Sequence, residues 1–136
     1  MPQSAKAVVR QWFDEVWNRK DAAAIDRLAS PQCVVHGLPE GGAGGIAGFR
    51  AFHQAFVSAY PDMQVAIEDL IEEGDRVAWR ITFRGTHSGP GLGIAATGLQ
   101  VAVGGIGISR VVNGQIVEGW NEFDRMGMMG QLGVRG

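Results

Sequence analysis

The chain has 136 residues, of which 46% are hydrophobic and 19% charged, and it carries a formal net charge of −2. This length and composition are typical of one globular domain, which we expect to span residues 1–136. The slightly acidic balance, without a cluster of Lys and Arg, argues against nucleic acid and against an anionic membrane surface as partners.

A single cysteine and the lack of long apolar segments further limit the class of protein and its location. Cys33 has no second cysteine to pair with, which excludes an intrachain disulfide, and its apolar neighbours favour a place in the core. No apolar stretch is long enough to span a membrane, and the residues from Met1 to Arg10 lack the apolar segment of a secretion signal. We therefore expect a cytoplasmic protein.

Three helices are predicted in the first half of the chain. Apolar residues recur at helical spacing over residues 4–18, where Ser4 is the expected cap, and a short helix over 22–29 follows a cap at Asp21. A brief strand is expected over 33–36. The third helix ends at Pro61 and carries its apolar side chains on one face, together with one histidine: Phe49, Phe52, His53, Phe56 and Tyr60. His53 is therefore expected on the buried side.

After Pro61 the apolar residues alternate, which predicts four sequential antiparallel strands and an α+β fold. Turns are expected at 73–75 and at 112–114, where Asn113-Gly114 favours a type I′ hairpin. The alternation places Trp79 on the inner face, and Arg80 on the outer face in an ion pair with Glu118. On the last strand it places one set of residues inside: Val117, Gly119, Asn121 and Phe123.

Three histidines and one inward amide are the candidates for chemistry. His36, His53 and His87 have side chains that titrate near neutral pH, so each is a candidate proton carrier, with a structural role as the alternative. Asn121 needs hydrogen-bond partners or a ligand on the inner face, and both interpretations stay open. The histidine spacing matches no metal-binding motif, and no glycine motif fits a nucleotide, so we expect neither metal nor cofactor.

Four segments of the chain resemble the SnoaL-like polyketide cyclases of the nuclear transport factor 2-like superfamily. They are VRQWFDEVWNRKD (9–21), AYPDMQVAIEDLIEEGDRVAWRITFRGTHSG (59–89), TGLQVAVGGIGISRVVNGQIVEGWNEFD (97–124) and MGQLG (129–133). The resemblance implies a cone-shaped fold, with N-terminal helices packed on a strongly curved mixed, mostly antiparallel sheet around a pocket. It also implies an oligomer built through the sheet, which we expect to be a homodimer because Trp120 lies among charged residues on the outer face.

The cyclases that this chain resembles close a ring by intramolecular aldol condensation without a cofactor. They use an Asp on the last strand as proton carrier and a His on the preceding strand. The matching positions here are Asn121 and Gly107, and neither side chain can carry a proton at neutral pH.

Our first hypothesis is a cofactor-independent cyclase, or a related lyase or isomerase, acting on a hydrophobic aromatic or polycyclic molecule. One of the three histidines would be the acid/base, and Asn121 would donate to an oxyanion or carbonyl. The pocket wall would consist of five aromatic side chains: Trp12, Phe13, Phe56, Trp79 and Phe123. The alternatives are a non-catalytic binding domain and an epoxide-hydrolase-type enzyme, which needs inward carboxylates paired with Arg and for which only Asp69 is a candidate.

Overall fold

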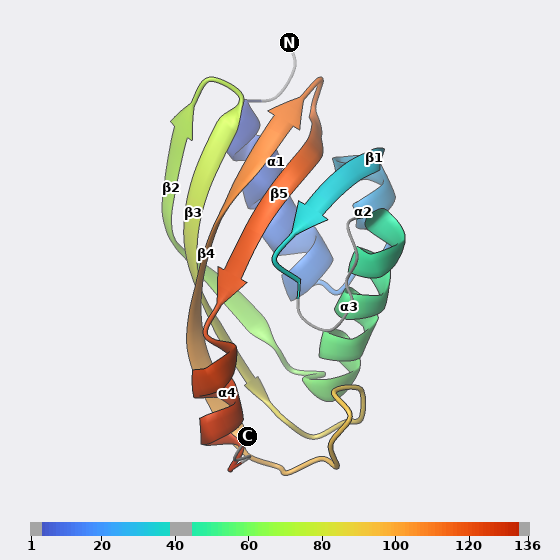
Figure 1. Ribbon diagram of the computed structural model, residues 1–136, viewed down its shortest axis with the longest axis vertical. Helices are drawn as coiled ribbons and strands as arrows, with labels where there is room; N and C mark the ends of the chain where they lie inside the picture. Colours follow the sequence, from blue (N-terminus) through green and yellow to red (C-terminus); the bar gives the residue numbers. More distant parts are fainter. Residues whose placement is uncertain (1–3, 39–44, 134–136) are drawn as a thin grey trace.

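The structure is a computed structural model that describes residues 4–38 and 45–133. Its helices and strands follow one another in the predicted α+β order (Figure 1). They are α1 (Ala5–Trp12), the π-helix η1 (Phe13–Asn18), α2 (Ala23–Leu28), β1 (Ala29–His36), α3 (Ile46–Ala59), β2 (Gln64–Glu73), β3 (Arg76–Thr86), β4 (Gln100–Val112), β5 (Gln115–Phe123) and α4 (Arg125–Gln131).

The five strands form one sheet in the order β1-β5-β4-β3-β2. Strands β2 to β5 pair antiparallel with their neighbours in sequence, and β1 pairs parallel to β5, so the predicted mixed, mostly antiparallel sheet is confirmed. Figure 1 shows that the sheet is strongly curved and that α1, α2 and α3 lie on one side of it. None of the described helices covers the other side of the sheet in this way, and the main core lies between α1 to α3 and the concave face.

The first strand begins earlier than the sequence predicted. It starts at Ala29, immediately after α2, and includes Ser30 and Pro31. Proline lacks the backbone N–H that an inner strand needs, but β1 lies at the edge of the sheet, where this is tolerated. The helix ends at Leu28, one residue earlier than predicted, because Ala29 is already extended and begins the strand.

The predicted N-terminal helix is divided into an α-helical and a π-helical part. Ser4 caps α1 as expected, since its hydroxyl oxygen accepts a hydrogen bond from the backbone N–H of Ala7 at 3.1 Å. From Phe13 the turns widen, and the N–H of Arg19 bonds to the carbonyl of Asp14, five residues back, at 2.9 Å. The wider turns bury Phe13, Val16 and Trp17 on the side facing the core.

Two bulges change which side chains face inward. A register shift between Ile67 and Asp69 turns Asp69 to the outer face, where its carboxylate accepts from Arg80 Nε at 2.7 Å. A second shift, between Arg110 and Val111, brings Ile116 to the inner face in place of Val117. A bulge adds one residue to one strand, so simple alternation assigns the wrong face beyond it.

The predicted ion pair between Arg80 and Glu118 is wrong. β4 lies between the two strands, and Arg80 is opposite Ile106 of β4 rather than any residue of β5. Glu118 instead contacts His36, whose Nε2 lies 2.8 Å from its carboxylate. None of the helices in the described part of the chain is both long and apolar enough to cross a membrane.

Candidate small-molecule pocket

A cavity opens between the helices and the concave face of the sheet. It contains about 1020 Å³ of empty space, with the open solvent at its mouth included. Its wall is mainly apolar and rich in aromatic rings, which the inward faces of α1, η1, α3, β3 and β5 carry. All five side chains that the sequence suggested as wall residues line it: Trp12, Phe13, Phe56, Trp79 and Phe123.

Few polar side chains line this cavity. They belong to Cys33, Ser109, Asn121 and Glu122. Of these four residues Glu122 is exposed to solvent. Burial, with a smaller contribution from the negative charge of Glu118, raises the pKa of the Cys33 thiol to about 11, so the thiol stays protonated at neutral pH. Among the residues that the structure describes, no His, Lys or Arg side chain lines the cavity.

Asn121 is held by the end of the first strand. Its Nδ2 donates a hydrogen bond to the carbonyl oxygen of His36 at 3.0 Å. The chain then turns at Gly37, whose φ is +83° and whose Cβ, if present, would lie only 2.0 Å from the backbone oxygen of Asn121. A glycine is therefore required beside Asn121, and the amide has a fixed position in the cavity wall.

Trp79, Gly107 and Asn121 form one row across the inner face of three neighbouring strands. The indole of Trp79 covers Gly107, because a Cβ there would lie 2.2 Å from the ring atom Cζ2. The indole Nε1 donates to Ser109 Oγ at 3.1 Å, and the ring of Phe13 meets the indole edge-on at 5.1 Å. The position that matches the histidine of the cyclases is thus filled by a tryptophan from the next strand.

His36 lies on the outer face of the sheet. Cys33 and Val35 are buried, so the alternation along β1 turns His36 away from the cavity. Its ring stacks on Trp120 at 5.2 Å, and its Nε2 lies 2.8 Å from a carboxylate oxygen of Glu118. The structure therefore does not bring His36 to the pocket, although its backbone carbonyl helps to hold Asn121.

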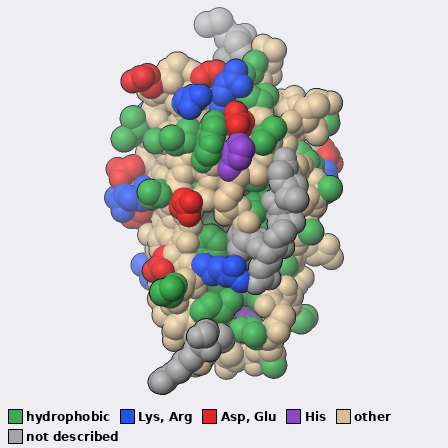
Figure 2. Space-filling model, viewed as in Figure 1, with side chains coloured by type: hydrophobic (Ala, Val, Ile, Leu, Met, Phe, Trp, Pro, Cys, Tyr) green, Lys and Arg blue, Asp and Glu red, His purple; other side chains and the backbone are tan. Residues whose placement is uncertain are grey.

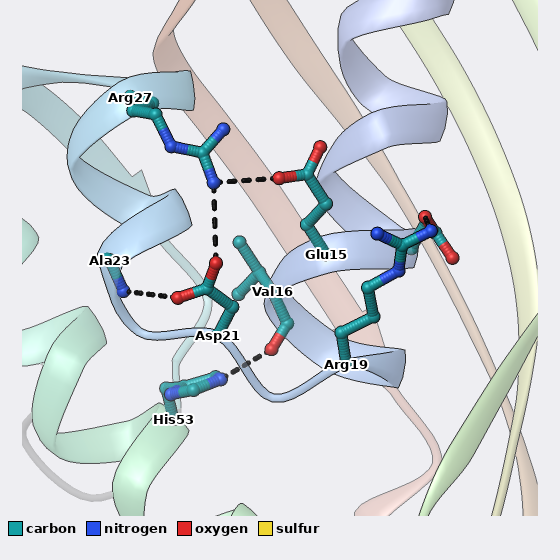
Figure 3. A network of polar contacts seen from close by, with 8 residues as sticks. Glu15, Val16, Arg19, Asp21, Ala23, Arg27 and His53 are labelled. Carbon is teal, nitrogen blue, oxygen red and sulfur yellow. Dashed lines mark hydrogen bonds and ion pairs between the residues drawn. The ribbon is translucent and has the colours of Figure 1, made fainter.

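His53 is buried between α3 and η1, behind the cavity wall. Only 4% of it is exposed, and Nε2 donates to the carbonyl oxygen of Val16 at 2.6 Å (Figure 3). Figure 3 also shows Arg27 joined to Glu15 and Asp21 on the adjacent surface. Burial lowers the pKa of His53, against the opposing effect of the hydrogen bond to Val16. The ring is therefore neutral at pH 7.

This burial makes stability depend on pH. The unfolded chain binds a proton at His53 below about pH 6.5, while the folded chain, with its lower pKa, does not. The free energy of unfolding should therefore fall as the pH drops below 6.5, by at most about 1.4 kcal/mol per pH unit from this residue. Urea unfolding at pH 7.5, 6.5 and 5.5 measures the slope. His53→Gln keeps a donor for Val16 but cannot titrate, so equal slopes in the two proteins would contradict the assignment.

His87 lies outside the cavity as well. It is fully buried after β3, where Nδ1 accepts from the backbone N–H of Thr97 at 3.1 Å, and its ring lies 5.5 Å from that of Tyr60. Its Nε2 has no hydrogen-bond partner in the described part of the chain. The histidine thus orders the segment between β3 and β4, and none of the three candidate histidines reaches the pocket.

The structure adds Ser109, which the sequence analysis did not single out. It lies on β4 two residues beyond Gly107, so the inner face of this strand carries only small side chains at Gly105, Gly107 and Ser109. Small residues at alternate positions of a strand were the available signal for a close approach by another group. Within residues 4–38 and 45–133, no three or more His, Cys, Asp and Glu side chains are arranged to hold a metal ion.

A curved sheet with helices on its concave side and a pocket between the two layers is the nuclear transport factor 2-like fold, which the solved structures described below share. The family model of the SnoaL-like polyketide cyclases matches residues 7–132. The chain therefore belongs to the SnoaL-like polyketide cyclase family, as its sequence motifs predicted. A comparison with curated proteins gave no match.

Solved structures of similar sequence share the fold over almost their whole length. IdmH from Streptomyces antibioticus, proposed to be a polyketide cyclase, is 30% identical, with 97% of this chain and 100% of that chain covered and a TM-score of 0.82. TsrD from Streptomyces laurentii is 33% identical, with 96% and 98% covered and a TM-score of 0.81. AclR from Streptomyces galilaeus, proposed to be a hydroxylase, is 28% identical, with 97% and 86% covered and a TM-score of 0.83.

Proposed function

We propose that the pocket binds a hydrophobic aromatic or polycyclic molecule and that the protein promotes a cyclase-like ring closure on it without a cofactor. The observation that carries this proposal is the aromatic cavity with a fixed Asn121 amide in its wall. Aromatic walls give large contact area to flat ligands, and a confined flexible substrate loses the entropy that opposes ring closure before the reaction begins.

The chemistry open to Asn121 is donation rather than proton transfer. In an intramolecular aldol closure a carbon–carbon bond forms, and the hydrogen lost from the attacking carbon ends on the new hydroxyl, so no external acid is consumed. One N–H of Asn121 is bonded to His36, and the second is left to stabilise the negative charge that develops on the carbonyl oxygen. We propose that the substrate itself or water carries the hydrogen.

Asn121→Leu tests this role. The variant keeps the volume but removes both N–H groups, so we expect the rate of ring closure to fall by about 100-fold or more, as for loss of one oxyanion donor. Substrate affinity should fall much less, because the aromatic wall is intact. The measurement is turnover of a flexible poly-β-ketone against the uncatalysed rate, together with the dissociation constant of a rigid polycyclic ketone. An unchanged rate in the variant would reject the role.

A non-catalytic binding domain is the second candidate, favoured by the absence of a histidine from the described cavity wall. The two functions differ in one experiment with Asn121→Asp, which places a carboxyl group at the position matching the cyclases. If the native protein binds polycyclic ketones without turnover and this variant gains ring closure, binding is the function. The hydrolase alternative has no support here, because Asp69 faces outward and the described lining contains no Arg.

We further propose that the protein is a homodimer through the outer face of the sheet. Apolar side chains on this face are exposed, Ile106 by 56%, and lie among charged ones, as Figure 2 shows. Trp120 also lies on this face. The ring of His36 stacks on its indole, and the guanidinium of Arg76 lies 5.3 Å from the centre of the indole ring. Sedimentation at micromolar concentration should give twice the chain mass, and Ile106→Asp should give the monomer. A native monomer contradicts the proposal.

A further inference from the structure

An open space lies over Gly119 on the inner face of β5. Gly119 is buried and lines the cavity, yet among the described residues, its two chain neighbours aside, a Cβ there would meet only Asn121 Nδ2 at 3.7 Å and the backbone oxygen of Ile108 at 4.0 Å. Both distances are ordinary van der Waals contacts, so the glycine is not required by packing. The missing side chain leaves room for an atom of a ligand.

Ser109 borders this space from the neighbouring strand. It is the cross-strand partner of Gly119 and is itself buried in the cavity wall. Its oxygen accepts from the indole N–H of Trp79, which leaves the hydroxyl hydrogen to be donated elsewhere. Among the described residues no acceptor takes that hydrogen. A hydroxyl donor is therefore oriented by Trp79 and has no protein partner of its own.

Asn121 borders the same space from β5 itself, two residues beyond Gly119. His36 offers a carbonyl, which can only accept, so the amide nitrogen must be the atom that faces it. The same nitrogen is the atom nearest to the space over Gly119, and it carries a second hydrogen. Two donors, one O–H and one N–H, therefore border one small gap in a mostly apolar wall.

The charge of the wall restricts what this gap can hold. No described Lys, Arg or His lines the cavity. A carboxylate or phosphate buried there would lose its hydration, and no positive charge would offset the free-energy cost. A neutral carbonyl oxygen has no such cost and accepts two hydrogen bonds. The gap thus favours an uncharged acceptor.

We propose that Ser109 and Asn121 together bind one uncharged carbonyl oxygen of the ligand over Gly119, and that this subsite selects planar aromatic ketones over carboxylates and over hydrocarbons. This inference deepens the proposed function and rests on it. Ser109 acts here as a specificity-determining residue, and Trp79 positions it.

Three probes of nearly the same shape test the selection: 9-fluorenone, fluorene and fluorene-9-carboxylate. Equilibrium dialysis should show that 9-fluorenone binds about 10-fold more tightly than fluorene, since neutral hydrogen bonds contribute modestly to binding. The carboxylate should bind more weakly than either. Equal binding of ketone and hydrocarbon overturns the subsite but leaves the small-molecule pocket in place, whereas no binding of either probe rejects the proposed function as well.

Two variants locate the effect. Ser109→Ala should lower the affinity for 9-fluorenone by about 3- to 10-fold and change the affinity for fluorene by no more than about twofold. Gly119→Ala places a methyl group in the gap without a clash, so it should fold normally and lose the preference for the ketone. Gly130→Ala, on α4, is the matched control and should keep the preference, because in the described part of the chain the new methyl meets no atom within 4 Å beyond its own helix backbone. A ketone preference that survives in both Ser109→Ala and Gly119→Ala overturns the proposal.

Discussion

Replacement of Phe56 by alanine should lower the free energy of unfolding by about 3 to 5 kcal/mol, the usual cost of removing a buried phenyl ring. Phe56 is 6% exposed and lies on α3 where the helix faces the sheet. Its ring contacts four others, at centroid distances of 4.8 Å to Phe52, 5.6 Å to Phe123, and 5.9 Å to both Tyr60 and Phe83. Its loss therefore separates the helix from two strands at once.

Urea unfolding of three variants measures the effect and its cause. Phe56→Leu keeps most of the apolar volume and should cost about 1.5 kcal/mol or less. Ile71→Ala also removes apolar atoms, but Ile71 is 66% exposed, so it should change stability by about 0.5 kcal/mol at most. A similar loss in Phe56→Ala and Ile71→Ala would show that the ring cluster does not hold the helix on the sheet.

The aromatic wall was predictable because its residues follow the helical and strand periods directly. Phe56 repeats with Phe49 and Phe52 on one helix face, and Trp79 alternates with Ile81 and Phe83 on a strand without a bulge. Large apolar side chains at regular spacing have one favourable direction, toward the core. The inward face of these elements could therefore be assigned before the structure was known.

The faces of Asp69 and Val117 could not be assigned in this way. Asp69 directly follows a bulge in β2, and Val117 is the extra residue of a bulge in β5. The hydrophobicity of a residue does not indicate whether it is the extra residue of a bulge. The location of His87 depends on the segment between β3 and β4, which is held by contacts to Thr97 far along the chain. Such long-range contacts leave no local pattern in the sequence.

The polar part of the site was only half predictable. Asn121 was found because it is an amide among apolar neighbours on the last strand. Ser109 was missed because a single serine between isoleucine and arginine on a strand matches no motif, and its importance comes from Trp79 on another strand. The inward direction was readable from the sequence, but the hydrogen bond between strands was not.

Replacement of Gly107 by alanine should destabilise the protein by about 3 kcal/mol, at the upper end of the cost of overpacking a core. The new Cβ would lie 2.2 Å from Trp79 Cζ2 and 2.3 Å from the backbone oxygen of Trp120, so both the indole and strand β5 would have to move. Gly104→Ala is the matched control on the same strand, because among the described residues its Cβ meets only the Ile81 oxygen, at 3.8 Å. It should change stability by about 0.5 kcal/mol at most. Equal stability of the two variants in urea unfolding would contradict the contact.

A double mutant separates the two clashes at Gly107. Trp79→Phe removes the ring atoms that approach Gly107 but leaves the oxygen of Trp120, so the pair of changes should cost less than the sum of the single ones, by about 1 kcal/mol. An additive result would mean that the backbone contact alone excludes a side chain at this position. The same geometry explains why Asn121→Asp is the more informative single change. A histidine at position 107 needs the space that the indole occupies, so the supporting histidine of the cyclases cannot be introduced while Trp79 is present.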